Sequence, residues 1–322
     1  MAQRSILLTG AAGFIGSHTA ERLLARGDTV VGIDNFNPYY NPAQKRQNAR
    51  ELAQYPNFRM LEGDLRDTQL LARVFAQYRF SAVIHLAAMA GVRASVEEPE
   101  LYYDVNLTGT LRLLEKSRQA GRPHFVFAST SSAYGRTERI PFCEDDTSDR
   151  PLAPYPASKR SAELLGHAYH HMHGMDFTAL RFFTVYGPRN RPDMLAHLAL
   201  DACAGRRTLY LYQNGEMYRD WTYVGDIADG VVAAADRRLG YQIINLGRGE
   251  PVKLADFVSK VSAQHGGRPR IESRPMPTAD VAQTFASIDK ARRLLDYNPT
   301  VSVDEGIAAL TSWYRSDQLA SQ

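Results

Sequence analysis

The sequence predicts an α/β protein in which a doubly wound parallel sheet is followed by a smaller, mixed α/β lobe. A short apolar run near the amino terminus leads into a glycine-rich turn and then a helical pattern. Apolar runs and helical patterns alternate as far as residue 182, as parallel strands joined by crossover helices do. Beyond residue 182 the alternation becomes irregular. We therefore expect one domain over residues 1–182 and a second lobe over 183–322, with some later segments returning to the first.

The first turn has the features of a dinucleotide-binding turn. Residues 5–9 read as a strand, and Gly10, Gly13 and Gly16 follow it directly. These glycines permit a tight turn, so the free amides at the start of the next helix can bind a pyrophosphate. The next strand, 29–33, ends at Asp34, 18 residues beyond Gly16. An acidic group there accepts a hydrogen bond from a ribose 2′-hydroxyl and repels a 2′-phosphate, which favours NAD over NADP.

Further strands are expected at 58–61, 82–84, 124–128 and 177–182, with helices around 67–77 and 100–120. Ligands of such sheets bind beyond the carboxyl ends of the strands. The side chains at those ends, or on the helices that follow, are Asp64, Leu86, Ala87, Ala88, Asn106, Thr130 and Tyr155. We expect them to line one crevice. The aromatic and basic insertion over 35–55 either caps the adenosine side of this crevice or packs against the domain.

Tyr155 and Lys159 are four residues apart, which places both side chains on one face of a helix. A cation near a phenol favours the phenolate, and bringing the pKa of a tyrosine to neutrality takes about 4 kcal/mol. Lys159 and a second positive charge could supply this, and the tyrosine could then accept a proton from a sugar hydroxyl. The alternative is a buried tyrosine with an exposed lysine one turn away.

The second lobe is expected to contain helices near 194–204, 226–238, 253–265 and 302–315 and strands near 208–212 and 218–222. Arg191 and Arg219 are its candidates for binding an anionic ligand, because a guanidinium matches phosphate or carboxylate through two parallel hydrogen bonds. For either arginine alone, a surface ion pair is the competing interpretation.

Composition argues against several classes of partner. The net charge of +3 and the scattered basic residues do not indicate a nucleic-acid surface. No stretch has the length or apolar character of a signal peptide or a membrane span, so we expect a cytoplasmic protein without membrane contact. Cys143 and Cys203 lie far apart, which suits a reducing compartment.

Four histidines close together raise the question of a zinc site: His167, His170, His171 and His173. They have no acidic partner in the sequence pattern, so we expect no metal and interpret this segment as an exposed or subunit-contacting helix.

Many segments together resemble the extended short-chain dehydrogenase/reductase superfamily, over nearly the whole chain. They are Thr9–Gly16, Gly63–Leu65, His85–Ala88, Asn106, Ser129–Gly135, Tyr155 with Lys159, and Arg219–Tyr223. Within it the sequence is most similar to nucleotide-sugar epimerases, and among these to the UDP-glucuronate 4-epimerases. The segments that carry this narrower similarity are Asp34–Tyr40, Ala90–Arg93, Arg181–Pro188 and Arg191–Met194.

The resemblance implies a Rossmann-type NAD-binding domain over 1–182, a lobe over 183–322 that mainly binds a UDP-sugar, and a catalytic triad of Thr130, Tyr155 and Lys159. Tyr155 would deprotonate the sugar 4-hydroxyl while hydride passes from C4 to the nicotinamide. Thr130 would hydrogen-bond the same oxygen, and Lys159 would bind the nicotinamide ribose and lower the pKa of Tyr155. The 4-keto sugar would turn over and take the hydride back on its other face.

Further site residues follow from the same resemblance. Expected at the cofactor are Gly10, Gly13, Phe14, Ile15, Gly16, Asp34, Asn35, Asn37, Asp64, Leu65, Leu86, Ala87, Ala88, Asn106, Tyr155 and Lys159. Expected at the substrate are Arg93, Thr130, Ser131, Ser132, Tyr155, Thr184, Arg191, Tyr210, Arg219 and Asp280. Helices 100–120 and 155–173 form the pairing surface in this superfamily, so a homodimer is expected.

The choice of substrate depends on one carboxylate. A 4-ketone is β to the C6 carboxylate of a uronate, and β-keto acids lose carbon dioxide readily. Decarboxylases of this superfamily carry asparagine where this chain has Thr184, and Thr184 with Arg191 resembles the epimerase pattern for holding the carboxylate. Sugar 4,6-dehydratases carry an acidic pair where Ser131 and Ser132 stand.

Two departures from the family pattern affect substrate preference. The loop 188–191 lacks a common tryptophan-glycine pair, and 277–279 lacks the usual glycine before Asp280. The alternatives are a UDP-glucuronate decarboxylase, a neutral UDP-sugar 4-epimerase and a non-enzymatic NAD-binding sensor or scaffold.

Overall fold

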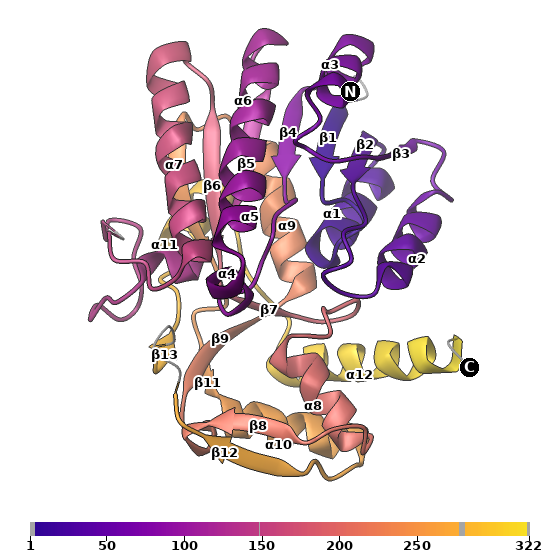
Figure 1. Cartoon of the computed structure of the whole chain (residues 1–322), viewed down its shortest axis with the longest axis vertical. Helices are drawn as coiled ribbons and strands as arrows, with labels where there is room; N and C mark the ends of the chain where they lie inside the picture. The colour runs from indigo at the N-terminus through magenta and orange to yellow at the C-terminus, as the bar shows by residue number, and fades with distance from the viewer. Residues whose placement is uncertain (1–3, 148, 277–280, 321–322) are drawn as a thin grey trace.

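Seven parallel strands form the main sheet of the computed structural model, which describes residues 4–147, 149–276 and 281–320 (Figure 1). Their order in space is β10-β6-β5-β4-β1-β2-β3. Their bounds are β1 Ser5–Thr9, β2 Thr29–Asp34, β3 Phe58–Glu62, β4 Ala82–His85, β5 His124–Thr130, β6 Phe177–Phe182 and β10 Tyr241–Leu246. The chain winds outward from β1 to β3 and then back through β4, so the predicted doubly wound sheet is confirmed.

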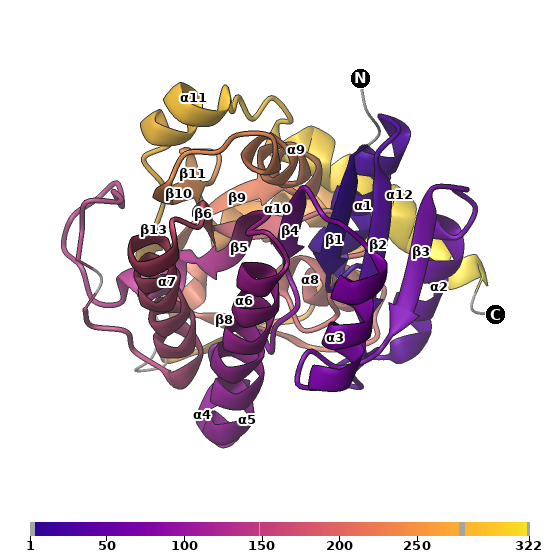
Figure 2. The same cartoon turned by 90° about the horizontal axis from the view of Figure 1, so that it is seen from above.

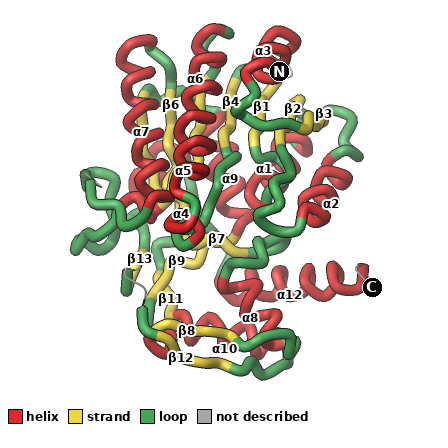
Figure 3. The backbone as a smooth tube through the Cα atoms, in the orientation of Figure 1, coloured by secondary structure: helices red, strands yellow, loops and turns green. Residues whose placement is uncertain are grey.

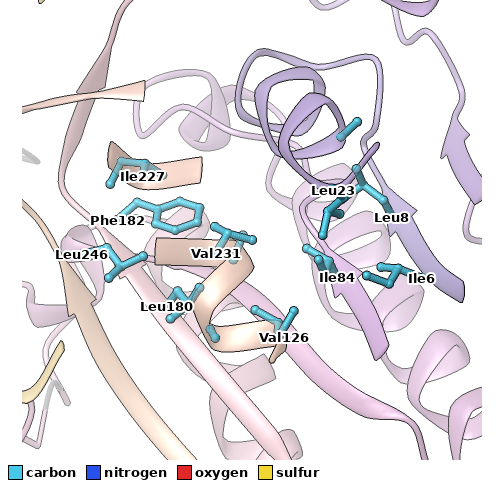
Figure 4. Close-up of a cluster of buried hydrophobic side chains, with 14 of the residues drawn as sticks. Ile6, Leu8, Leu23, Ile84, Val126, Leu180, Phe182, Ile227, Val231 and Leu246 are labelled. Carbon is cyan, nitrogen blue, oxygen red and sulfur yellow. The ribbon is translucent and has the colours of Figure 1, made fainter. Parts of the chain in front are cut away.

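Both faces of this sheet are covered by helices, because its strands carry apolar side chains on both sides. Ile6 and Leu8 point to one face and Leu7 to the other. The first face is covered by α1 (Phe14–Ala25), α2 (Pro42–Leu52), α9 (Val224–Ala235) and α11 (Asp289–Leu295) (Figure 2). The second is covered by α3 (Thr68–Gln77), α6 (Gly109–Gln119) and α7 (Pro154–His173). Figure 4 shows the first of these cores, where Leu23 of α1 and Val231 of α9 lie over the strands.

The smaller lobe has its own core and its own short sheets. One sheet contains β7 (Thr184–Tyr186), β9 (Tyr218–Tyr223), β11 (Pro251–Lys253) and β13 (Gln283–Thr284), and a second pairs β8 (Leu209–Tyr212) with β12 (Ile271–Arg274). Helices α8 (Leu195–Cys203), α10 (Leu254–His265) and α12 (Val303–Ala320) surround them. Trp221 stacks on Phe257 at the centre, which ties β9 to α10.

Three segments beyond residue 182, α9, β10 and α11, belong to the larger domain rather than to the lobe. The strand β10 pairs with β6 over its full length, and α9 packs across the first face of the sheet. The helix expected over 226–238 is therefore present as Val224–Ala235 but covers the larger domain.

The helix expected over 100–120 is interrupted. It consists of α5 (Pro99–Tyr103), a π-helical turn (Asp104–Thr108) and α6, and the short helix α4 (Ala94–Glu97) precedes it. The wider turn places the buried Asn106 against the backbone of Met89, so a tertiary contact coincides with the break in helical regularity.

Candidate active site

The glycine turn lies at the carboxyl end of β1 and allows close backbone contacts. A Cβ atom on Gly10 would lie 2.7 Å from the backbone nitrogen of Ala87, and one on Gly16 would lie 1.9 Å from the carbonyl oxygen of Gly10. Helix α1 begins directly after Gly13. The free amides at its start are therefore available to an anion at this edge of the sheet.

A cavity of about 420 Å³ opens at this edge. The loops that follow the strands lie here, between the sheet and the smaller lobe (Figure 3). It brings together most of the residues that the sequence singles out: Gly10, Gly13, Phe14, Ile15, Gly16, Asp34, Asn35, Asn37, Asp64, Leu65, Leu86, Ala87, Ala88, Thr130, Ser131, Ser132, Tyr155, Lys159, Thr184 and Arg191.

Asp34 is held at the end of β2 by two backbone amides. Its carboxylate accepts hydrogen bonds from the amides of Ala12 at 3.1 Å and Phe36 at 2.9 Å. Burial raises the pKa of Asp34, while these bonds and the nearby charge of Lys45 oppose the rise.

Lys45 is a cavity residue that the sequence reasoning missed. Its ammonium donates to the carbonyl oxygen of Asn37 at 2.9 Å and lies 4.4 Å from the centre of the Tyr40 ring. Lys45, Asn37 and Tyr40 all line the cavity, so the insertion over 35–55 both packs and lines the site. Nothing in the local pattern distinguishes Lys45 from a solvated helix lysine.

Asp64 is fixed by a neighbouring arginine. Arg66 donates to both of its oxygens at 2.9 Å, and Asn35 donates to one of them at 3.0 Å. The hydrogen bonds from Arg66 lower the pKa of Asp64 to about 2. Asp64 is thus an ionised acceptor at the cavity wall.

Asn106, expected at the cofactor, does not line the cavity. Its side chain accepts from the amide of Met89 at 2.9 Å and donates to the carbonyl oxygen of Met89 and to Ser158 Oγ, both at 3.0 Å. Met89 does line the cavity, so Asn106 shapes the wall from behind.

The three predicted catalytic residues meet where β5 ends and α7 begins. The side chains of Thr130 and Tyr155 share a hydrogen bond. Lys159 is 2% exposed, donates to the carbonyl oxygen of Ala128 at 2.8 Å and lies 4.6 Å from the centre of the Phe127 ring. The alternative of an exposed lysine is therefore wrong.

The predicted effect of Lys159 on the tyrosine is not seen in the polypeptide alone. Burial raises the pKa of Tyr155, and the groups that oppose this rise are Thr130, through its hydrogen bond, and Arg191, through its charge. Burial also lowers the pKa of Lys159 to about 7, against the charge of Glu163. Dehydration disfavours the charged form of both side chains, and sequence spacing contains no information about it.

A second cavity of about 540 Å³ adjoins the first and extends into the smaller lobe. Both cavities are lined by Gly91, Ser131, Ser132, Thr184 and Arg191, and the second adds Arg93 and Arg219. The cavity is also lined by Glu97 and Asp193, so its three arginines outnumber its acidic side chains, which favours an anionic ligand.

Tyr210 does not line either cavity. Its ring lies under the guanidinium of Arg274, which is 3.4 Å from the ring centre. Asp280 is outside the described residues.

Arg191 is paired, as the competing interpretation expected, but inside the site rather than at an outer surface. Its Nε and Nη2 atoms donate to the two oxygens of Asp193, each at 2.9 Å. Tyr39 donates to the same carboxylate at 3.2 Å.

The loop that departs from the family pattern is anchored to the larger domain. Arg189 has a left-handed backbone with φ of 63° and donates to Glu21 of α1 and Glu51 of α2, each at 2.6 Å. Gln44 also donates to its carbonyl oxygen at 3.0 Å. These contacts bring the loop that carries Arg191 close to the cofactor side.

The histidine-rich end of α7 is engaged by aromatic contacts. His167 packs edge-on against Tyr241, and His170 lies near the same ring and bonds the carbonyl oxygen of Met175 at 2.8 Å. Among the residues with a described placement, no cluster of three His, Cys, Asp or Glu side chains could hold a metal ion. Over residues 4–147, 149–276 and 281–320, no helix has the length and apolar character needed to cross a bilayer.

Comparison with known proteins places this geometry in a family. The family model described as GDP-mannose 4,6 dehydratase matches residues 7–310. The chain belongs to the NAD-dependent epimerase/dehydratase family of extended short-chain dehydrogenases/reductases.

Several family members are similar over almost their full length. The UDP-glucuronate 4-epimerase of Thermodesulfobacterium geofontis is 42% identical, over 97% of this chain and 96% of that protein. A probable UDP-glucuronate 4-epimerase of Rhizobium meliloti is 39% identical, over 96% of each chain. The crystal structure of the UDP-glucuronic acid 4-epimerase of Bacillus cereus with UDP-glucuronic acid and NAD is 34% identical, with a TM-score of 0.91 over 97% of this chain and 99% of that one.

Proposed function

We propose that this member of the family is an isomerase that binds NAD and interconverts UDP-glucuronate and UDP-galacturonate by 4-epimerisation. One observation carries the proposal: a tyrosine hydrogen-bonded to a threonine lies in the same cavity as the glycine turn and as Thr184 and Arg191. One cavity is therefore lined by a proton acceptor, by a dinucleotide-binding turn and by a group that binds carboxylates. The relatives named as UDP-glucuronate 4-epimerases support the choice of substrate.

The residues around the first cavity fit NAD. The amides after Gly13 suit the pyrophosphate, Asp34 suits a ribose hydroxyl, and Asp64 offers an ionised acceptor at the cavity wall. Asp34 opposes a 2′-phosphate on the adenosine ribose by charge repulsion. Bound NAD⁺ would supply the hydride acceptor and donor and, through its nicotinamide ring, a positive charge near the phenol.

The roles of the catalytic side chains follow from their placement. Tyr155 takes the proton of the sugar 4-hydroxyl. Thr130 forms a hydrogen bond with the Tyr155 phenol and, with substrate bound, one with the sugar O4 atom. Because burial raises the pKa of Tyr155, the phenolate needs positive charges beside it, and Arg191 is one of them. Lys159 is positioned by Ala128 to bind the nicotinamide ribose.

The sugar carboxylate is assigned to Thr184 and Arg191, both of which line the two cavities. We assign the diphosphate to Arg219 in the second cavity and keep Arg93, Ser131 and Ser132 as further substrate contacts. On this assignment residues 1–182 bind the cofactor and residues 183–322 mainly bind the nucleotide sugar. The segments α9, β10 and α11 are the parts that return to the larger domain.

We also propose a homodimer that pairs through the interrupted helix over 100–120, which includes α5 and α6, and through α7. Large apolar side chains are exposed along this surface: Tyr103 and Leu111 at 39%, Leu164 at 55% and Met172 at 60%. Both helices lie side by side on one face of the sheet in Figures 1 and 2. Sedimentation equilibrium tests this, since a monomer at micromolar concentration would contradict it.

A cytoplasmic location is part of the proposal. Both Cys143 and Cys203 are free thiols in the structure, which suits a reducing compartment. Fractionation of the producing cells is the direct measurement.

Incubation of purified protein with UDP-glucuronate tests the function. We expect UDP-galacturonate to appear by chromatography without net consumption of NAD. Release of carbon dioxide as the main outcome would indicate a decarboxylase, and turnover of UDP-glucose that is indifferent to Arg191→Ala would indicate a neutral-sugar epimerase. A protein that binds NAD but converts none of these sugars would be a sensor or scaffold.

A further inference from the structure

Asp193 and Tyr39 form a cluster with Arg191 in the second cavity. Asp193 follows Arg191 by two residues, whereas Tyr39 comes from the insertion after β2 and reaches the same carboxylate across 154 positions of sequence. The Arg191 guanidinium also lies 5.7 Å from the centre of the Tyr39 ring. The arginine assigned to the sugar carboxylate is thus held by a carboxylate that belongs to the chain.

This pairing decides which edge of the Arg191 guanidinium is available. Its Nε–H and one N–H of Nη2 donate to Asp193, each at 2.9 Å, and the second N–H of Nη2 remains on the edge that Nη2 shares with Nη1. Among the described residues, none accepts a hydrogen bond from Nη1, and this atom is not buried. A ligand carboxylate can therefore reach Arg191 through the Nη1–Nη2 edge without displacing Asp193.

The pairing also removes most of the net charge. Burial raises the pKa of Asp193, but hydrogen bonds and charge from Arg191 outweigh that effect and leave the pKa below its ordinary value. Asp193 is therefore ionised at neutral pH and formally cancels the charge of Arg191. Such a pair recognises a carboxylate by the direction of the remaining N–H groups more than by net charge.

Tyr39 is itself tightly placed. Its amide donates to the side chain of Asn37 at 2.8 Å, and its hydroxyl would lie 2.7 Å from a Cβ atom on Gly91. Asn37 is also the residue whose carbonyl oxygen Lys45 holds. The orientation of Arg191 is therefore connected, through Tyr39, to the loop that lines the cofactor side of the site.

Building on the proposed function, we propose that Asp193 and Tyr39 are positioning residues that fix Arg191 so that its Nη1–Nη2 edge bonds the sugar carboxylate. Their effect is on the fate of the 4-keto sugar. Its C5–C6 bond can break when it stands perpendicular to the carbonyl plane: C6 leaves as carbon dioxide, the electron pair enters the C4–C5 enolate, and C5 takes a proton from water. A carboxylate held from one fixed direction is kept out of that orientation, so hydride returns to C4 with the carboxylate still attached.

The test measures carbon dioxide and epimer in the same sample for wild type, Asp193→Asn and Tyr39→Phe. In both variants we expect the ratio of carbon dioxide to epimer to rise roughly tenfold. A displacement of about 1 Å can change the rate of a positioned reaction by about 10²-fold, and we expect a smaller shift of the carboxylate here. Inhibition by UDP alone should be unchanged, since Asp193 and Tyr39 act on the carboxylate and not on the diphosphate. Asp229→Asn is the matched control, because Asp229 pairs with Arg22 at an exposed site and lines neither cavity.

Two results would overturn the inference and leave the proposed function in place. One is an unchanged ratio in both variants of an active epimerase. The other is a parallel loss of UDP inhibition and epimerisation at an unchanged ratio, which would indicate a general structural role. A wild-type protein that forms no epimer would instead refute the proposed function.

Discussion

Replacement of Glu163 by glutamine should destabilise the protein severely, because Glu163 and Arg181 form a fully buried ion pair behind the catalytic residues. The side chain of Glu163 is 0% exposed and that of Arg181 is 1% exposed. Arg181 donates to the two carboxylate oxygens at 2.9 and 2.7 Å, Ser129 donates at 2.5 Å, and Arg160 donates at 3.1 Å. The Arg181 guanidinium also stacks on Tyr134, 4.4 Å from the ring centre.

The magnitude follows from what the substitution leaves behind. Burial lowers the pKa of Arg181, but the hydrogen bonds to Glu163 raise it by more, so the arginine cannot lose its charge. Breaking a buried pair by removing one partner costs about 3–5 kcal/mol, because the remaining charge is uncompensated. Glutamine keeps the shape but directs an amide donor at other donors, so we expect a loss in that range.

Urea unfolding followed by circular dichroism measures this loss. The double variant Glu163→Leu with Arg181→Met should be more stable than Glu163→Gln, since an apolar replacement of both partners removes the stranded charge. A loss below about 1 kcal/mol for Glu163→Gln would refute the reasoning, because only exposed pairs contribute so little. So would a double variant less stable than the single one.

Three further outcomes are expected. Tyr155→Phe should reduce epimerisation by about 10²–10⁴-fold and leave NAD binding intact, as measured by turnover and by calorimetry, because only the proton acceptor is removed; wild-type turnover would contradict the role of the phenol. Gly10→Ala should lower the free energy of unfolding by roughly 2–4 kcal/mol, because the new Cβ adds both left-handed backbone strain and overpacking against Ala87. Gly174→Ala is the control: its φ is 64° but nothing lies within 4 Å of its Cβ, so it should cost only the backbone strain. Equal losses in the two variants would exclude a steric clash at Gly10. His85, held between Thr9 at 2.7 Å and Thr110 at 2.9 Å, has its pKa lowered to about 3 by burial. Between about pH 6.5 and 3 the unfolded chain therefore binds a proton at His85 that the folded chain does not, and the free energy of unfolding should fall by up to ~1.4 kcal/mol per pH unit as the pH drops. Urea titrations at pH 7 and 5 should show a smaller loss of stability between the two pH values for His85→Asn than for wild type. The same loss in both proteins would count against this role of His85.

The strands of the main sheet and the glycine turn could be predicted because their signals are local. Gly10 and Asp34 each lie where a strand ends, and that position alone assigns them to the carboxyl edge of the sheet. The spacing of Tyr155 and Lys159 similarly predicts a shared helix face, and both residues line the same cavity.

The parts that could not be predicted depend on contacts between distant residues or on burial. Lys45 enters the cofactor cavity only because the insertion folds back over Asn37. Tyr39 meets Asp193 through tertiary structure alone. The π-helical turn at Asp104–Thr108 coincides with the bond between Asn106 and Met89, and the raised pKa of Tyr155 reflects dehydration.

The late return of β10 has a consequence for biosynthesis. Residues 183–240 leave the ribosome between β6 and the strand that covers its outer edge. During that interval the nascent sheet presents an open, hydrogen-bonding edge, the type of surface that chaperones shield from aggregation. A chain that stops at residue 182 would leave β6 as the outermost strand, without the partner that β10 provides in the complete sheet.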